Sequence, residues 1–184
     1  GLSQVDMVIS DSHKGLVKAV KQCFQGAAWQ RCQTHFSRNM LDVCPKKLHP
    51  EMKAALKSLY EAGDYETAVL LRDNILLRFQ QEAPKAAALL EESFEDVMAV
   101  LALPFAMRRR LRTTNGIERL NEEIRRRERV IRIFPNEESL SRLIGALLME
   151  INDGWQSGKV YLDLTAYLTQ QLQVDKPTAK KSVA

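Results

Sequence analysis

The sequence predicts a mostly helical α/β fold, in which a β-α-β segment is followed by a large block of helices. Two observations predict this fold. A short apolar run with β-branched residues lies near the start, at residues 5–10, and a helical pattern follows it. From about Pro50 to Met107, apolar residues recur at a spacing of three and four, which is typical of helices with one buried face. We therefore expect a partial α/β domain that carries a large all-α insertion.

The β-α-β segment is expected within residues 1–45. Residues 5–10 (VDMVIS) form the first strand, and Asp11 and Ser12 can cap the helix after them. Residues 29–35 form a second candidate strand, which a helical crossover makes parallel to the first. Asp11 then lies at the carboxyl end of a parallel strand, where open α/β sheets bind ligands. Since two strands alone form no stable sheet, we expect further strands from an upstream segment or from another chain.

Residues 46–110 are expected to form the helical insertion. Gly63 ends its first helix, Asp64 caps the second and Pro84 opens the third, as these residue types commonly do. The apolar stripes contain Met52, Leu56, Leu59 and Tyr60, then Val69, Leu71, Ile75, Leu76 and Phe79, then Leu89, Leu90, Phe94, Val97, Met98 and Leu101. Stripes of this kind predict a packed core, and we find no cofactor-binding motif in them.

Residues 111–172 are expected to form the C-terminal helices of the domain. Asn115 can cap a basic helix, and Asn136 can cap the next helix, which Gly154 ends. The remaining tail, residues 173–184, has few apolar residues, and its composition predicts disorder.

The positive charge is concentrated in the basic helix and the residues before it. Residues 108–132 contain ten arginines and four glutamates, a local charge of 10 − 4 = +6, whereas the whole chain of 184 residues carries +4. The rest of the chain therefore sums to −2. Clustered arginine is the usual footprint of a phosphate backbone. The alternative is a solvated helix on which glutamates pair with arginines.

Two carboxylates are candidate metal ligands. Glu118, Glu122, Arg125 and Arg129 share one flank of the basic helix, beside its apolar stripe. A carboxylate on that flank is a plausible ligand for a hard cation. Two alternatives remain open: Glu118 closes a capping box with Asn115, and Glu122 pairs with Arg126. Asp11 has the same ambiguity between a helix cap and a metal ligand.

Other kinds of site find little support in the sequence. Cys32 and His35 form one Cys-x-x-His pair, which is at most half of a zinc site. The three cysteines suggest no disulfide framework, so we expect a reducing, cytoplasmic compartment. No apolar run reaches the ~18 residues of a membrane span, and the start lacks the pattern of a signal peptide. Glycine-rich nucleotide loops and serine-hydrolase motifs do not occur either.

Four stretches together resemble the mutator-type bacterial insertion-sequence transposases. They are VISDSHKGL, QRCQTHFSRN, RTTNGIERLNEEIRRR and FPNEESLSRLIGALLMEINDGW, in this order, and the similarity extends from residue 1 to about 162. The resemblance implies an RNase H-like catalytic domain with a DDE triad of carboxylates. It also implies that Mg²⁺ or Mn²⁺ is the cofactor and that the terminal inverted repeats of a transposon are the DNA partner. The implied activity is DNA transposition, a form of DNA recombination.

The resemblance assigns roles to individual residues. Asp11 matches the second aspartate of the triad and Glu118 its glutamate, so both are expected to be catalytic metal ligands. Cys32 and His35 match a signature near the active site, and His13 belongs to the same motif as Asp11. The arginines expected to bind DNA are Arg112, Arg119, Arg125, Arg126, Arg127 and Arg129, of which Arg125 matches a basic residue near the active site.

One member of the triad has no match in this sequence. The first aspartate of the family lies on a strand upstream of Asp11, and Asp6 does not match that position. We therefore expect the C-terminal part of a transposase, inactive by itself, from an intact enzyme that is a homo-oligomer at the bacterial nucleoid. The alternatives are a catalytically inactive DNA-binding remnant and a helical interaction protein.

Overall fold

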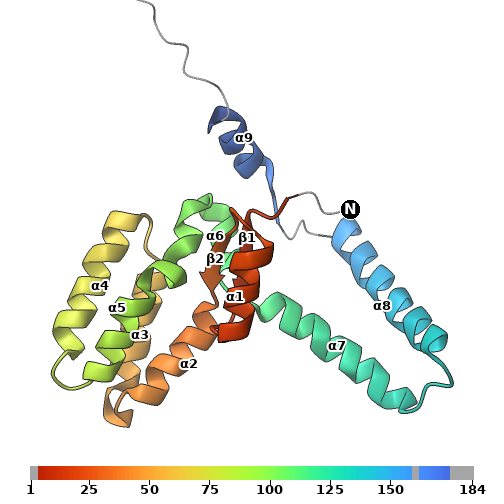
Figure 1. Ribbon diagram of the computed structural model, residues 1–184, viewed down its shortest axis with the longest axis horizontal. Helices are drawn as coiled ribbons and strands as arrows, with labels where there is room; N and C mark the ends of the chain where they lie inside the picture. Colours follow the sequence, from red (N-terminus) through yellow and green to blue (C-terminus); the bar gives the residue numbers. More distant parts are fainter. Residues whose placement is uncertain (1–3, 159–161, 175–184) are drawn as a thin grey trace, which may run out of the picture. The chain divides into compact units, whose positions relative to one another are not determined.

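The computed structural model describes residues 4–158 and 162–174, and these residues are mostly helical (Figure 1). The chain divides into two compact units, Gly1–Gly116 and Ile117–Ala184, and each is described by itself. The first unit contains the two short strands and the helical block. The predicted combination of a β-α-β segment with many helices is therefore confirmed, whereas the division into residues 1–45, 46–110 and 111–172 stays a prediction.

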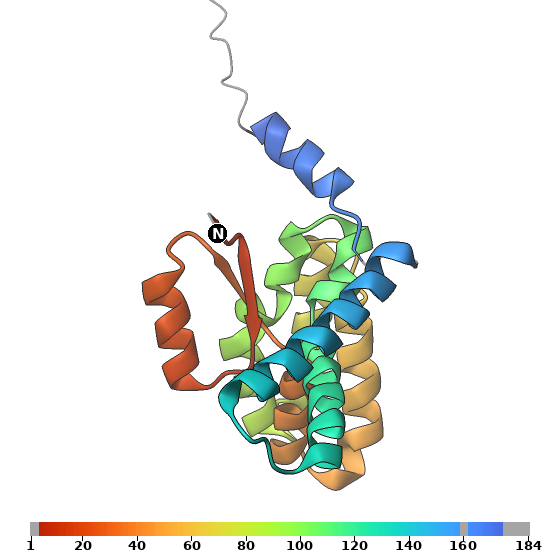
Figure 2. The same ribbon diagram turned by 90° about the vertical axis from the view of Figure 1, so that its right-hand side faces the viewer.

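The β-α-β segment consists of β1 (Met7–Ser10), α1 (Lys14–Cys23) and β2 (Ala28–Arg31). The two strands are parallel, as predicted, with Val8 opposite Trp29 and Ser10 opposite Arg31. Figure 2 shows α1 set on one side of the strands. Because the strands run in the same direction, Ser10 and Arg31 end them at the same edge of the sheet, which brings the following residues, Asp11 and Cys32, to that edge.

The second strand is shorter than predicted. β2 ends at Arg31, and α2 (Gln33–Val43) begins after Cys32, so the prediction of a strand through His35 is wrong. The backbone N–H of Gln33 donates to the carbonyl of Arg112 (3.0 Å), and its side-chain amide donates to the carbonyl of Val97 (3.0 Å). These tertiary hydrogen bonds take the place of pairing within the sheet. Residues 30–35 are mostly polar, so no pattern of apolar residues in them could predict these hydrogen bonds.

The predicted cap of α1 is also wrong. His13 is the N-cap residue, and no side chain forms a cap hydrogen bond there. Asp11 instead accepts a hydrogen bond at Oδ1 from the backbone N–H of His13 (3.2 Å). This contact spans two residues, as in an Asx turn, and lies before the helix begins.

The helical block contains the core of the molecule. It is formed by α2, η1 (Lys46–Leu48), α3 (His49–Tyr60), α4 (Tyr65–Phe79), α5 (Pro84–Met98), η2 (Ala99–Ala102) and α6 (Phe105–Leu111). The three predicted helices of the insertion are confirmed, and Asp64 caps α4 by accepting from the backbone N–H of Thr67 (2.7 Å). Large apolar side chains from α2 to α5 meet in this core and are almost fully buried: Phe36, Met40, Met52, Leu56, Leu59, Phe79, Leu90 and Phe94.

A buried glutamine joins the sheet to the helical block. The side chain of Gln30 has no exposed surface. Its amide donates to the carbonyl of Val97 (2.7 Å), and its side-chain oxygen accepts from the backbone N–H of Val100 (2.6 Å). A buried polar group that loses such partners costs ~1–3 kcal/mol, so these bonds fix β2 against the end of α5.

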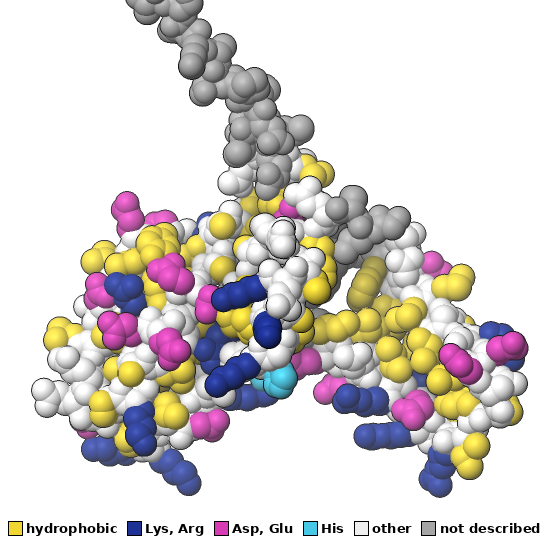
Figure 3. Space-filling view, viewed as in Figure 1, with side chains coloured by type: hydrophobic (Ala, Val, Ile, Leu, Met, Phe, Trp, Pro, Cys, Tyr) yellow, Lys and Arg dark blue, Asp and Glu magenta, His cyan; other side chains and the backbone are white. Residues whose placement is uncertain are grey.

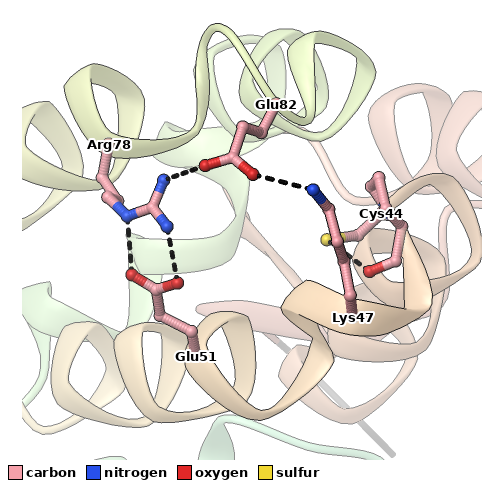
Figure 4. A network of polar contacts seen from close by, with 6 residues as sticks. Cys44, Lys47, Glu51, Arg78 and Glu82 are labelled. Atoms are coloured by element: carbon pink, nitrogen blue, oxygen red, sulfur yellow. Dashed lines mark hydrogen bonds and ion pairs between the residues drawn. The ribbon is translucent and has the colours of Figure 1, made fainter.

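Ion pairs on the surface of the helical block connect helices that are distant in sequence (Figure 4). Arg78 on α4 donates to both carboxylate oxygens of Glu51 on α3 (2.7 and 2.8 Å) and to Glu82 (2.9 Å). Glu82 also pairs with Lys47 (3.1 Å). Since these side chains are largely exposed, each pair contributes only ~0–1 kcal/mol. We therefore assign this network to the structure of the insertion and not to its chemistry.

The second unit contains most of α7 (Asn115–Ile131), together with α8 (Glu137–Ser157) and α9 (Thr165–Val174). Asn136 caps α8, as predicted, by accepting from the backbone N–H of Ser139 (2.9 Å). The predicted end of that helix at Gly154 is wrong, because the helix continues to Ser157 and tolerates an interior glycine at a cost of ~1 kcal/mol.

Two further predictions concern the end of the chain and membranes. The tail predicted to be disordered lies, from residue 175 onward, outside the described residues. Across residues 4–158 and 162–174, every helix is too short or too polar to cross a lipid bilayer.

Candidate active site

Asp11 directly follows β1, at the edge of the sheet where both parallel strands end. Its side chain is exposed, and its carboxylate accepts a hydrogen bond from the backbone N–H of His13. An exposed carboxylate with further lone pairs fits a hard divalent cation such as Mg²⁺, which prefers carboxylate oxygen and keeps several water ligands. The position and chemistry of Asp11 therefore fit the predicted role.

Cys32 occupies the matching position after β2 and is completely buried. Its backbone N–H donates to the carbonyl of Ser10 (2.7 Å), which holds the end of β2 beside the residue that precedes Asp11. Its Sγ atom accepts two hydrogen bonds from Thr114, one from the backbone N–H (3.4 Å) and one from Oγ1 (3.3 Å). Cys32 thus connects the end of β1, through its backbone, to the segment that leads into α7, through its sulfur.

Arg112, two residues before Thr114, also fixes the segment that leads into α7. The carbonyl of Arg112 accepts from the backbone N–H of Gln33 (3.0 Å), and its guanidinium donates to the carbonyl of Tyr60 at the end of α3 (3.1 Å). Arg112 was predicted to bind DNA; in the structure it is half-buried and bonded to protein. DNA binding by Arg112 stays a prediction. Its hydrogen bonds with Gln33 and Tyr60 position the segment before α7.

The hydroxyl of Tyr60 contacts α2, while the backbone carbonyl of Tyr60 binds Arg112. Its hydroxyl lies 2.9 Å from Oγ of Ser37 and 3.4 Å from the carbonyl of Gln33. Burial raises the pKa of Tyr60 to about 12, although the hydrogen bond with Ser37 acts in the opposite direction. The phenol therefore stays neutral, and its hydrogen bonds connect α3 to α2.

Glu118 lies in the first turn of α7, four residues after Thr114, and is half-buried. A carboxylate near a helix N-terminus is stabilised by the helix dipole, and a half-buried one is suited to a site from which water is partly excluded. Asp11 belongs to the first unit and Glu118 to the second, so their approach in space stays a prediction.

The Cys-x-x-His pair lies where β2 gives way to α2, with Cys32 as the N-cap residue of α2 and His35 in its first turn; its place near the active site stays a prediction. Burial raises the pKa of the Cys32 thiol, but hydrogen bonds involving Thr114 and His35 lower it, and the net pKa lies below its ordinary value. Among the described residues, no third His, Cys, Asp or Glu joins this pair in an arrangement that could hold a metal ion. The two hydrogen bonds from Thr114 make the sulfur of Cys32 an acceptor within the protein.

His13 lies at the start of α1 and is exposed. Its ring packs over Gly15, because a Cβ atom placed on Gly15 would lie 3.2 Å from Cε1 of His13. Glycine at position 15 therefore leaves room for the imidazole of His13.

The basic helix α7 has two kinds of arginine. Arg126 donates to both carboxylate oxygens of Glu123 (2.6 and 2.8 Å), and Arg127 donates to Oε1 of the same residue (3.1 Å). These hydrogen bonds lower the pKa of Glu123 to about 2. Arg126 therefore pairs with Glu123 and not with Glu122, the partner that the spacing suggested. Three more arginines on this helix are exposed: Arg119, Arg125 and Arg129.

Sequence reasoning missed Thr114 and Trp29. Thr114 belongs to the Thr-Thr-Asn stretch shortly before Glu118. Its position near Glu118 in the sequence was the one signal that could have indicated a role for it. Trp29 lies on β2 and donates from its indole N–H to Oγ of Ser10 (2.9 Å). No spacing rule connects these residues to the ends of the strands, because each contact depends on the tertiary fold.

Comparisons with known proteins identify the family of this chain. The family model described as "Transposase, Mutator family" matches residues 1–158. The transposase for insertion sequence element IS256 in transposon Tn4001 of Staphylococcus aureus is 42% identical over 166 residues, which are 89% of this chain and 42% of that protein.

Two further relatives show a similar degree of identity. The IS1081 transposase of Mycobacterium tuberculosis is 40% identical over 164 residues, covering 89% of this chain and 40% of the relative. The ISRM5 transposase of Rhizobium meliloti is 40% identical over 164 residues, covering 89% of this chain and 41% of the relative. The chain thus spans about two fifths of the length of these relatives, and it belongs to the Mutator family of transposases.

Proposed function

We propose that this chain is the part of an insertion-sequence transposase that supplies two of the three metal-binding carboxylates, Asp11 and Glu118. The observation that carries the proposal is the pair of contacts made by Cys32. Its backbone binds the carbonyl of Ser10, next to Asp11, and its sulfur binds Thr114, four residues before Glu118. The segments that lead to the two carboxylates are thereby attached to the same buried residue, one through its backbone and the other through its sulfur.

The proposed fold of the catalytic domain is RNase H-like, with more strands than residues 4–158 and 162–174 contain. Within those residues, β1 pairs with β2 on one edge only, and an open edge readily accepts another strand. The third carboxylate would come from such a strand. The greater length of the relatives supports this, because the chain covers 40% to 42% of those compared above.

The chemistry proposed is the cutting and joining of phosphodiester bonds at the terminal inverted repeats of a transposon. Mg²⁺ or Mn²⁺, when bound, supplies activation of the attacking water or 3′-hydroxyl and stabilisation of the leaving oxygen. Asp11 and Glu118 would provide carboxylate oxygens as ligands for the metal ion. The exposed arginines of α7 neutralise neighbouring phosphates and position the DNA without reading its bases.

The intact enzyme is proposed to act as a homo-oligomer in the bacterial cytoplasm, on the DNA of the nucleoid. A second candidate function applies to residues 1–184 by themselves, namely DNA binding without cleavage. Two observations favour it: the exposed arginines of α7 and the presence of only two residues that match the triad. Mg²⁺ needs near-ideal coordination, so two of three carboxylates are not expected to support catalysis.

The test uses a longer Mutator-family transposase that contains this segment, with end cleavage and end binding measured separately. Asp11→Asn and Glu118→Gln should each reduce cleavage by several orders of magnitude and leave binding of end DNA nearly unchanged. Asp42→Asn and Glu128→Gln are matched controls, since they remove exposed carboxylates of α2 and α7. Residues 1–184 alone should bind DNA and not cut it. Cleavage that survives Glu118→Gln would contradict the proposal.

A further inference from the structure

A groove of about 540 Å³ lies between α1, β2 and α5, all within the first unit. None of the roles assigned above involves it. It is lined by Ser12, Lys14, Val17, Lys18, Lys21, Gln22, Trp29, Arg31, Leu89, Glu92, Ser93 and Asp96. The volume is large enough for one nucleotide, and the lining combines an aromatic ring, cations and carboxylates.

The wall formed by α1 is cationic. Lys14, Lys18 and Lys21 are spaced by four and three residues, so they lie on one face of the helix, and all three are exposed. Figure 3 shows basic side chains gathered over α1. With Arg31, the groove contains four cations against the two carboxylates Glu92 and Asp96, a balance of 4 − 2 = +2. A phosphate group is thus attracted to the α1 side.

The floor and the opposite wall suit a nucleobase. Trp29 is half-buried, and its ring lines the groove with the apolar side chains of Val17 and Leu89. Its indole N–H is bonded to Oγ of Ser10 (2.9 Å), which fixes the plane of the ring. Glu92 and Asp96 on α5 offer acceptors to the amino groups of a base. Arg31 donates to Oγ of Ser93 on the same helix (2.7 Å), and its charge interacts with both carboxylates.

One of the lining residues of the groove, Ser12, directly follows Asp11 in the sequence. We propose that it receives one unstacked nucleotide of the DNA strand that is cut, with the base against Trp29 and its phosphate against the lysines of α1. This proposal rests on the proposed function, since it places the nucleotide next to the reacting phosphate. The groove would hold the strand in register while Asp11 acts on it.

The test measures binding of a single-stranded oligodeoxyadenylate to residues 1–184 and compares it with an abasic phosphodiester of the same length. The chain has two tryptophans, Trp29 and Trp155, so Trp155→Phe leaves Trp29 as the only fluorophore of this kind. The oligodeoxyadenylate should quench Trp29 fluorescence in a saturable manner, whereas the abasic oligomer should not. Anisotropy of a labelled oligomer gives the affinities of variants.

Trp29→Leu should weaken oligodeoxyadenylate binding by roughly 5- to 150-fold, the loss of one base–aromatic stack. Trp29→Phe keeps an aromatic face without the indole N–H and should restore most of that binding. Lys18→Ala with Lys21→Ala should weaken both oligomers. Lys46→Ala with Lys85→Ala removes two exposed lysines that do not line the groove, and should have a smaller effect. Circular dichroism checks that each variant is folded.

Equal affinity for the two oligomers, or no quenching of Trp29 at saturation, would overturn the nucleotide site. That result would leave the proposed function intact, because end cleavage by the longer transposase does not depend on this measurement. The opposite outcome is also distinguishable. If DNA quenches Trp29 but cleavage by the longer transposase survives Glu118→Gln, the groove is a DNA contact and Glu118 is not catalytic.

Discussion

The sulfur of Cys32 accepts two hydrogen bonds from Thr114, from its backbone N–H at 3.4 Å and from its hydroxyl at 3.3 Å, across 82 residues of sequence. Cys32 has no exposed surface. This contact fixes the segment just before α7 to the end of β2, although the helical block lies between them in the sequence.

Replacing Cys32 should destabilise the fold through Thr114. Cys32→Ala leaves two donors of Thr114 without their acceptor and removes buried volume, which should lower the free energy of unfolding by ~1–3 kcal/mol. Cys32→Ser keeps an acceptor and should cost less. The double variant Cys32→Ala, Thr114→Val should lose less than the sum of the single variants, because the pair interacts directly. Urea denaturation measures these values, and Cys23→Ser, at an exposed cysteine, is the control. Strict additivity would show that the contact contributes nothing.

The arginines of α7 should contribute unequally to DNA binding. Arg125→Ala with Arg129→Ala removes two exposed charges and should reduce the slope of log K against log salt by about two units, one per lost phosphate contact. Arg126→Ala with Arg127→Ala should reduce it less, because both side chains already interact with Glu123. Titration of duplex DNA at several salt concentrations measures both slopes. Equal slopes for wild type and the first variant would mean that another surface binds DNA.

Acid should weaken α7 through Glu123. The two arginines lower the pKa of Glu123 to about 2 from its ordinary value of 4.5. A depressed folded-state pKa means that the stabilisation is fully present above about pH 4.5 and is lost as the pH falls through 2. Helicity followed by circular dichroism should therefore decline over this range, and Glu123→Gln should remove that part of the decline. Glu128→Gln, on the same helix, should leave it in place.

Alkaline titration should single out Tyr60. Burial raises its pKa to about 12, so the neutral phenol stabilises the fold at every pH below the ordinary value of 10, and this contribution is lost as the pH rises through 12. Ultraviolet absorbance of tyrosinate should show one of the four tyrosines ionising last, in step with unfolding. Tyr60→Phe should remove that late transition. If the late transition remains in this variant, it belongs to another tyrosine.

Asp11 and Glu118 should lie close together in the assembled enzyme. Carboxylates that share two metal ions, which lie ~3.5–4 Å apart, must converge within several ångströms. In the longer transposase with Cys23 replaced by Ser, a short bifunctional thiol reagent should link Asp11→Cys to Glu118→Cys. The pair Asp42→Cys and Glu118→Cys is the control. Failure to link the first pair, with equal reactivity of both thiols, would contradict the assignment of these residues to one site.

The sequence by itself determined the elements whose signals are local. Asp64 and Asn136 were recognised as helix caps because a cap is a contact between neighbours in sequence. The helices α3, α4 and α5 were predicted because their apolar residues repeat with the period of a helix. The parallel direction of β1 and β2 was predicted because a helix connects the two strands. Asp11 and Glu118 came from the motif, and the family comparison supports the motif without testing the roles of these residues.

Only the tertiary structure decided where β2 ends and what Cys32, Arg112 and Trp29 contact. Gln33 was expected in a strand, but its backbone bonds to Arg112 and its side chain to Val97, which are 79 and 64 residues away (112 − 33 and 97 − 33). Arg126 likewise selected Glu123 instead of Glu122 by the geometry of its guanidinium on the folded helix. The contacts of Gln33 depend on which polar groups become buried together, and a one-dimensional pattern does not contain that information.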